Sequence, residues 1–89
     1  MNESAMTSSI RRSALELIES VNGLIPEKEV LRLSEYVEYN ELGLALEHLC
    51  DVIREQGICC PNSLRDQIVS LGERMQMDAV VWTGLSSEQ

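Results

Sequence analysis

The sequence predicts an all-α fold: a small up-down bundle of four helices, followed by a short fifth helix or a tail. Apolar residues recur every three or four positions in four segments, which is the spacing of helices with one buried face. Glycine, proline and asparagine residues separate these segments, and no segment alternates apolar and polar residues as a half-buried strand does. The 89 residues are therefore expected to form a single α-helical domain, residues 1–89, with a small aliphatic core.

The first helix is expected over residues 9–21, after a flexible arm at residues 1–8. Asn22 and Gly23 follow this helix, and glycine readily adopts the left-handed conformation that ends many helices. The apolar stripe of the helix consists of Ile10, Ala14, Leu17, Ile18 and Val21.

The second helix is expected to carry Pro26 in its first turn, where a missing N–H is tolerated. Tyr36 lies at the edge of the inner stripe, and Asn40 fits a break or a cap before the next helix. The inner stripe consists of Val30, Leu33 and Val37.

The third helix is expected over residues 41–56, closed by Gly57. Leu44 lies among acidic residues, away from the other apolar side chains. Either the helix is central and a second neighbour covers Leu44, or Leu44 is an exposed anchor for a partner. The main apolar face consists of Leu42, Ala45, Leu46, Leu49, Cys50 and Ile53.

The fourth helix is expected to begin at a capping pattern that starts with Ser63, after a connection that is extended before Pro61. The segment 79–82 contains β-branched residues, so both a short helix and an extended tail fit it. Trp82 is expected to pack as a lid over the open end of the core. The stripe of the fourth helix consists of Leu64, Ile68, Leu71 and Met75.

The net charge of −8 excludes two classes of ligand. Fifteen acidic residues outnumber seven basic ones, whereas nucleic acids and anionic membranes are bound by clustered Lys and Arg. No apolar run approaches the roughly 18–20 residues that span a bilayer. The polar N-terminus lacks the apolar core of a signal peptide, and three cysteines cannot all pair within the chain. These features predict a cytoplasmic protein.

The sequence shows no pattern of residues that indicates catalysis, a metal site or a cofactor. His48 is the only histidine, and it points about 200° away from Cys50 on a helix. Cys59 and Cys60 lack the spacing of metal ligands. We therefore expect no catalytic residue, no metal ligand and no cofactor, with His48 as a half-exposed helix residue and Cys50 as a small core residue.

An acidic surface is the strongest candidate for function. Between Leu33 and Ile53 there are five carboxylates and no Lys or Arg, whereas solvated helices usually mix both signs of charge. Such a surface fits a positively charged partner, and tyrosines are favoured anchors within a charged rim. The candidate binding residues are the carboxylates Glu35, Glu38, Glu41, Glu47 and Asp51, with Tyr36 and Tyr39 as anchors.

The run Glu41-Leu42-Gly43-Leu44-Ala45-Leu46-Glu47-His48-Leu49-Cys50-Asp51 also resembles the MafI-type immunity proteins of bacterial polymorphic toxin systems. Leu42 departs from the family pattern, which often has an aromatic residue there, and Cys59-Cys60 replaces a more usual aliphatic–polar connection. The resemblance covers residues 24–85. Its other matching residues are Leu24-Ile25-Pro26-Glu27, Ile58, Pro61, Ser63, Leu71-Gly72 and Trp82.

The resemblance implies an immunity protein that binds and neutralises the C-terminal domain of one cognate toxin, of the Maf or contact-dependent growth inhibition type. Such toxins are commonly nucleases, including EndoU-like RNases, and a nuclease presents a basic cleft that an acidic protein can fill or flank. The alternative from another class is a non-enzymatic helical adaptor that self-associates or scaffolds another protein. Self-association, for example as a homodimer, would use Leu44 or the segment 80–82.

Overall fold

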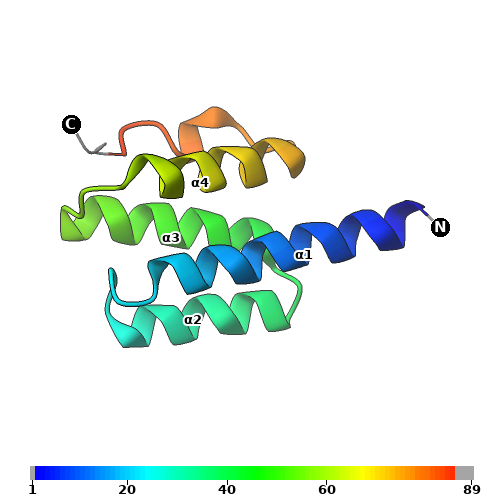
Figure 1. Ribbon diagram of the computed structural model, residues 1–89, viewed down its shortest axis with the longest axis horizontal. Coiled ribbons are helices and arrows are strands. Elements are labelled where there is room, and N and C mark those ends of the chain that lie inside the picture. The colour runs from blue at the N-terminus through cyan, green and yellow to red at the C-terminus, as the bar shows by residue number, and fades with distance from the viewer. Residues whose placement is uncertain (1, 86–89) are drawn as a thin grey trace.

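The computed structural model describes the backbone of residues 2–85 and the side chains of residues 8–85 (Figure 1). Four helices follow one another: α1 (Asn2–Val21), α2 (Glu27–Glu38), α3 (Leu42–Gln56) and α4 (Asn62–Arg74). A single 3-10 turn, η1 (Ala79–Val81), comes after them, and residues 2–85 contain no strand. The predicted all-α fold is confirmed, and the fifth element is a 3-10 turn.

The helices run alternately in opposite directions, as expected for an up-down bundle (Figure 1). α3 lies between α2 and α4, while α1 crosses in front of the α2–α3 pair and packs against α2 and α4. The η1 turn contacts α3 and α4. One flank of α3 therefore faces α2, and the other faces α4 and η1.

The first helix begins at Asn2, seven residues before the expected start at residue 9. Residues 2–8 are thus helical rather than a flexible arm, and Met1 lies outside the described residues. This end of α1 projects past the other helices in Figure 1. Apolar periodicity does not detect such an extension, because a projecting turn has no core to face.

Two helix starts differ slightly from the prediction. Pro26 precedes α2 rather than lying in its first turn, and Pro61 precedes α4 in the same way. The φ angles of these prolines, −59° and −58°, already suit a helix start. No side chain caps α4, so the capping pattern expected at Ser63 is wrong and Ser63 lies inside the helix.

Three helix ends share one hydrogen-bond pattern, in which an N–H bonds a carbonyl five residues earlier. The donors and acceptors are Glu41 N to Tyr36 O at 2.7 Å, Ile58 N to Ile53 O at 3.0 Å, and Met77 N to Gly72 O at 3.0 Å. The residue before each donor has positive φ: 60° at Asn40, 64° at Gly57 and 59° at Gln76. The stops predicted at Asn40 and Gly57 are confirmed, while Gln76 was not identified from the sequence.

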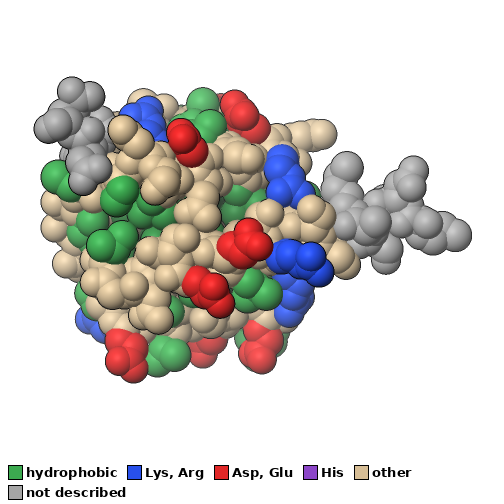
Figure 2. Space-filling model, viewed as in Figure 1, with side chains coloured by type: hydrophobic (Ala, Val, Ile, Leu, Met, Phe, Trp, Pro, Cys, Tyr) green, Lys and Arg blue, Asp and Glu red, His purple; other side chains and the backbone are tan. Residues whose placement is uncertain are grey.

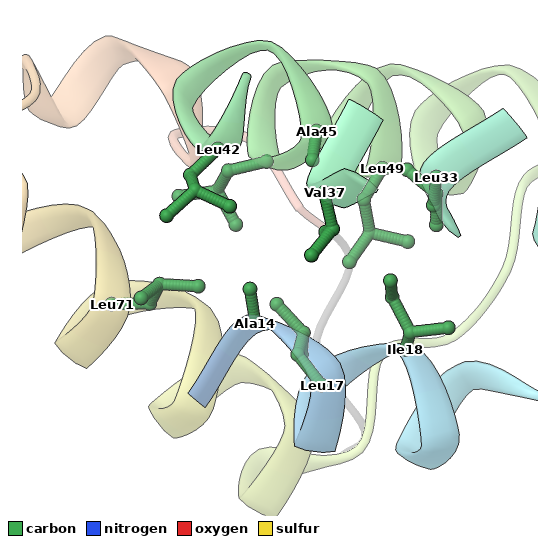
Figure 3. Close-up of a pocket in the computed structure, with 10 residues that line it drawn as sticks. Ala14, Leu17, Ile18, Leu33, Val37, Leu42, Ala45, Leu49 and Leu71 are labelled. Atoms are coloured by element: carbon green, nitrogen blue, oxygen red, sulfur yellow. The ribbon is translucent and has the colours of Figure 1, made fainter. Parts of the chain in front are cut away.

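The core is closed and aliphatic (Figure 3). Side chains from all four helices converge there and leave a void of only about 10 Å³. Among residues 8–85 no polar or charged side chain is buried. The buried apolar residues are Ala14, Leu17, Val21, Ile25, Leu33, Val37, Leu42, Ala45, Leu46, Leu49, Cys50, Val52, Ile53, Cys60, Leu64, Ile68, Leu71, Trp82 and Leu85.

Trp82 packs against the core and is buried, on the side formed by α3, α4 and η1. Its indole lies directly on Gly72 of α4, so close that a Cβ atom at position 72 would be 2.1 Å from Cζ3 of Trp82. Gly72 is therefore a contact surface for the indole, and any side chain there would displace it.

Candidate functional site

Four of the seven predicted binding residues line one open groove. Glu35, Tyr36 and Tyr39 come from α2 and its end, while Glu41 comes from the bend before α3. Arg32 and Leu44 complete the lining of the groove, which has a volume of about 630 Å³. We call this site the α2–α3 groove. The bend at Asn40 creates it, because the bend places the end of α2 beside the start of α3.

The two tyrosines occupy different environments within the groove. Tyr39 is 75% exposed, so its ring is open to solvent. Tyr36 is partly buried against the core, and its ring centroid lies 5.8 Å from that of His48 at an interplanar angle of 59°. Tyr36 is therefore held in place by its neighbours, and its position at the edge of the apolar stripe is confirmed.

A hydrogen bond between His48 and Glu29 holds in place the imidazole ring that Tyr36 contacts. Nε2 of His48 lies 2.7 Å from Oε1 of Glu29, and it joins α3 to α2. This hydrogen bond is the main reason that the pKa of Glu29 lies below its ordinary value. His48 is half-exposed, as expected, but its partner is 19 residues away in the sequence and no local pattern indicated the pair.

Leu44 is exposed at the surface and is not covered by a neighbouring helix. It is 47% exposed and lines the α2–α3 groove, although α3 contacts α1, α2, α4 and η1. The expectation that this helix is central, with neighbours on two sides, is confirmed, but these neighbours leave Leu44 about half exposed. The apolar side chain instead contributes to an open surface among carboxylates.

Glu47 and Asp51 lie on the other flank of α3. With Arg54, Val80 and Val81 they line a separate depression of about 270 Å³. Asp51 is not available as an unpaired charge, because its Oδ1 atom accepts a hydrogen bond of 3.0 Å from Nη1 of Arg54. The predicted binding residues thus line two separate depressions, and Glu38 lines neither of them.

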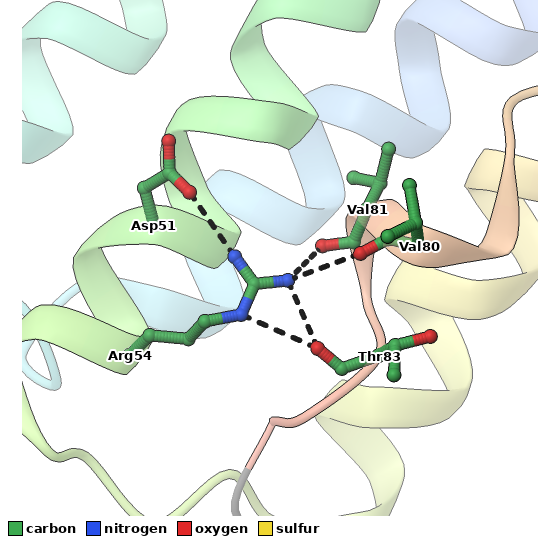
Figure 4. Close-up of polar contacts among 5 residues, drawn as sticks. All are labelled: Asp51, Arg54, Val80, Val81 and Thr83. Carbon is green, nitrogen blue, oxygen red and sulfur yellow. Dashed lines mark hydrogen bonds and ion pairs between the residues drawn. The ribbon is translucent and has the colours of Figure 1, made fainter.

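Arg54 fastens the C-terminal segment to α3 (Figure 4). Its guanidinium donates to the carbonyl of Thr83 from Nε at 3.3 Å and from Nη2 at 3.1 Å. It also donates to the carbonyls of Val80 and Val81. We call this arrangement the Arg54 clamp. Sequence reasoning missed it, because its acceptors are backbone atoms 26–29 residues away.

Charges are distributed differently over the face formed by α1 and α4. Acidic and basic side chains are mixed on the face that Figure 2 shows, and blue basic side chains gather near the N-terminal end of α1. Two of the hydrogen bonds between these helices come from Arg74, whose Nη1 and Nη2 atoms donate to Ser13 at 2.8 Å and to Ser9 at 2.6 Å. This face therefore has less of the one-sided acidity seen in residues 33–53.

The cysteines lie in two environments. Cys50 and Cys60 are fully buried, whereas Cys59 is exposed, and all three are free thiols. Burial raises the pKa of Cys50 to about 12 and also raises that of Cys60, which disfavours the reactive thiolate form. The expectation that Cys50 is a small core residue is confirmed.

Within residues 8–85 no three His, Cys, Asp or Glu side chains are grouped so that they could hold a metal ion. None of the described helices is both long enough and apolar enough to cross a membrane.

Comparisons with protein-family models, with curated proteins and with solved structures each give no match for this chain. The candidate site therefore rests on its own geometry: an open groove with two tyrosines, a leucine and two carboxylates.

Proposed function

We propose that this chain is an immunity protein that binds and neutralises one cognate bacterial toxin domain. The observation that carries the proposal is the α2–α3 groove, which combines exposed aromatic and aliphatic surface with the carboxylates Glu35 and Glu41. Protein interfaces draw most of their binding energy from a few aromatic and apolar anchors, and the surrounding charges favour the correct partner. The binding is stoichiometric and requires no chemical step from this chain.

The charge of the chain favours a basic partner. A net charge of −8 attracts a basic domain from a distance and raises the rate of association by up to 10–10³-fold at low salt. A nuclease domain presents such a basic surface, because it must bind the phosphates of its substrate. Together with the resemblance of residues 24–85 to MafI-type immunity proteins, this supports a nuclease toxin, for which an EndoU-like RNase is one candidate.

The direct test is co-expression with the toxin domain that this proposal expects a neighbouring gene to encode. We expect the protein to restore cell growth and to co-purify with the toxin domain as a 1:1 complex that weakens as salt increases. The variant with Glu35→Lys and Glu41→Lys should lose both properties. A matched variant with Glu38→Lys and Glu55→Lys changes the net charge equally at exposed positions outside the groove, and should retain rescue.

Rescue by both variants would exclude the groove as the interface, and failure of the unaltered protein to rescue growth would refute immunity to that toxin. Circular dichroism and thermal unfolding of each variant establish that its fold is intact. This control is informative because Glu35, Glu38, Glu41 and Glu55 are all exposed.

A helical adaptor that self-associates is the second candidate. Val80 is 67% exposed and Leu31 is 60% exposed, which favours an apolar contact with another molecule. Trp82 does not contribute to such a surface, because it is buried against Gly72. Sedimentation without toxin separates the candidates: an obligate oligomer that Val80→Ser dissociates supports the adaptor, and a monomer supports the immunity protein.

A further inference from the structure

The α2–α3 groove is organised before any partner binds. Its rear wall is Tyr36, which is fixed between the core and His48, and His48 is itself hydrogen-bonded to Glu29 at 2.7 Å. The bend beside it is closed by the 2.7 Å bond from Glu41 N to Tyr36 O. A groove that already has its shape loses little conformational entropy on binding, which favours affinity.

The two ends of the groove differ in charge. Arg32 lies one turn before Glu35, whereas Glu41 follows Tyr39 after the bend and has no basic residue beside it in the lining. Among the described side chains neither Glu35 nor Glu41 forms an ion pair within 4 Å. The negative potential is therefore expected to be strongest at the end formed by Tyr39, Glu41 and Leu44.

The lining at this end combines three chemical features. Glu41 supplies a carboxylate, Tyr39 an exposed aromatic ring, and Leu44 an exposed aliphatic surface. An arginine side chain suits the carboxylate and the aromatic ring, because its planar guanidinium pairs with carboxylates in two-pronged geometry and also stacks on aromatic rings. Leu44 then remains for an apolar residue beside the arginine. The ammonium of lysine is a compact, strongly hydrated charge that does not stack in this way.

The volume of the groove indicates more than one side chain. About 630 Å³ lies within the range of roughly 300–1,000 Å³ typical of sites that hold a drug-sized ligand. This space accommodates an arginine with one or two neighbouring apolar residues, and the carboxylates disfavour a phosphate or another anion. The occupant that fits is therefore a short segment of a protein.

We infer that the α2–α3 groove is the docking site for an arginine-bearing, apolar-flanked segment of the partner protein, with the guanidinium between Tyr39 and Glu41 and an apolar neighbour on Leu44. The inference rests on the proposed function for its choice of a basic partner. It goes beyond that function because it names the anchoring residue, its position in the groove and the charge at the opposite end. Arg32 then opposes binding, because it repels the arginine.

The inference is tested without the toxin, using the full chain and a blocked pentapeptide, acetyl-Ala-Leu-Arg-Leu-Ala-amide. Two-dimensional NMR of backbone amides locates the binding, and titration gives the affinity. We expect weak binding with shifts confined to residues 32–44. Peptides with citrulline, the neutral analogue of arginine, or with lysine should bind at least about threefold more weakly, since they lose the ion pair or the stacking contact.

Variants of the protein make the test specific. Tyr39→Ser and Glu41→Gln should each weaken binding of the arginine peptide by about tenfold or more, whereas Arg32→Gln should strengthen it by a few-fold. Glu55→Gln is the matched control for Glu41→Gln, because it removes one exposed carboxylate from α3 outside the groove. It should leave the affinity unchanged.

Several outcomes would overturn the inference: shifts spread over all acidic residues, equal binding of the citrulline peptide, or equal losses in Glu41→Gln and Glu55→Gln. Widespread shifts, or equal losses in the two variants, would indicate attraction by net charge alone. Equal binding of the neutral citrulline peptide would show that the charge of the guanidinium does not contribute to binding. Failure of the proposed function is distinguishable. A groove that binds the arginine peptide specifically, in a protein that does not neutralise the toxin, would support the groove and refute immunity to that toxin.

Discussion

The two flanks of α3 use their polar groups in opposite ways. On the flank that faces α4 and η1, the guanidinium of Arg54 bonds three backbone carbonyls and the carboxylate of Asp51 (Figure 4). Trp82 lies on Gly72 on the same flank. On the flank that faces α2, Glu35 and Glu41 form no ion pair with the described side chains, and Tyr39 and Leu44 are open to solvent. The first flank fastens the C-terminal segment to α3, and the second leaves its carboxylates, Tyr39 and Leu44 exposed.

This difference is informative because a polar atom that is already bonded within the fold is less available to bind a partner. The charge of Asp51 is partly offset by the guanidinium of Arg54, so it attracts a further basic group less strongly. An unpaired carboxylate beside exposed aromatic surface keeps its full attraction for such a group. We call the flank that faces α4 and η1 the closed flank, and the flank that faces α2 the open flank. Mutations on the closed flank should therefore reduce the stability of the fold, and mutations on the open flank should reduce binding of the proposed partner.

The largest effect is expected for Gly72→Ala on the closed flank. The new methyl group would overlap the indole of Trp82, at 2.1 Å from Cζ3, and displace it from the core. We expect a loss of about 1–3 kcal/mol in the free energy of unfolding, with a red shift in the emission of this single tryptophan. Urea denaturation followed by fluorescence measures both quantities.

The matched control for this prediction is Gly43→Ala in the first turn of α3. There the new methyl group would meet only the flexible end of Met77, at 4.0 Å. Because alanine favours helix by up to about 1 kcal/mol over glycine, the control should be neutral or stabilising. Equal losses in both variants would show that Trp82 does not depend on Gly72.

The Arg54 clamp provides the next largest effect. Replacing Arg54 with Gln removes the hydrogen bonds to the carbonyls of Val80, Val81 and Thr83, so the C-terminal segment should detach more readily. We expect a loss of about 1–2 kcal/mol in the free energy of unfolding. Amide hydrogen exchange should accelerate in residues 79–85 more than in α2. Uniform acceleration across the chain would contradict a local clamp.

The pair of His48 and Glu29 predicts a dependence of stability on pH. The hydrogen bond from His48 lowers the pKa of Glu29 in the folded state, so its contribution is present above the ordinary pKa of about 4.3 and disappears as the pH falls through the folded value. The wild type should therefore exceed Glu29→Gln in stability at pH 6, and the difference should decrease toward pH 3.

Thermal unfolding at several pH values measures this difference. Glu27→Gln is the matched control, because Glu27 is exposed in the same first turn of α2 and has no hydrogen-bond partner among the described side chains. A difference that stays constant between pH 6 and pH 3 for Glu29→Gln would show that the bond to His48 adds nothing to the stability of the carboxylate.

The smallest effect on stability is expected for Tyr39→Ser on the open flank. Because Tyr39 is 75% exposed, its removal should change the free energy of unfolding by no more than about 0.5 kcal/mol. The same substitution should abolish most of the affinity for the partner. A large loss of stability would show that Tyr39 contributes to the stability of the fold. The two flanks would then differ less than this comparison predicts.

The sequence predicted the helices better than their termini. The stripes of Leu33 and Val37, and of Leu64 and Ile68, are buried as expected, because a repeat of 3.6 residues allows only one face to reach the core. The starts of α1 and α4 were misplaced. A projecting helical turn and a proline-led start leave no apolar signal, so periodicity alone does not place them.

The candidate site was predicted in part. The carboxylates Glu35 and Glu41 and the tyrosines Tyr36 and Tyr39 were identified from charge and residue type, and the structure brings them into one groove. Sequence reasoning assigned Glu38, Glu47 and Asp51 to the same surface, although Glu47 and Asp51 line a second depression and Glu38 lines neither. Their separation depends on which helix packs on which flank.

By itself, the sequence determined the all-α fold, the composition of the core and the excess of negative charge, because these follow from local spacing and residue type. Only the tertiary structure decided that Leu44 is exposed, that His48 binds Glu29, and that Arg54 binds the C-terminal segment. These contacts join residues at least 19 positions apart or depend on an uncovered helix face. They arise from the packing of whole helices, which no short stretch of sequence encodes.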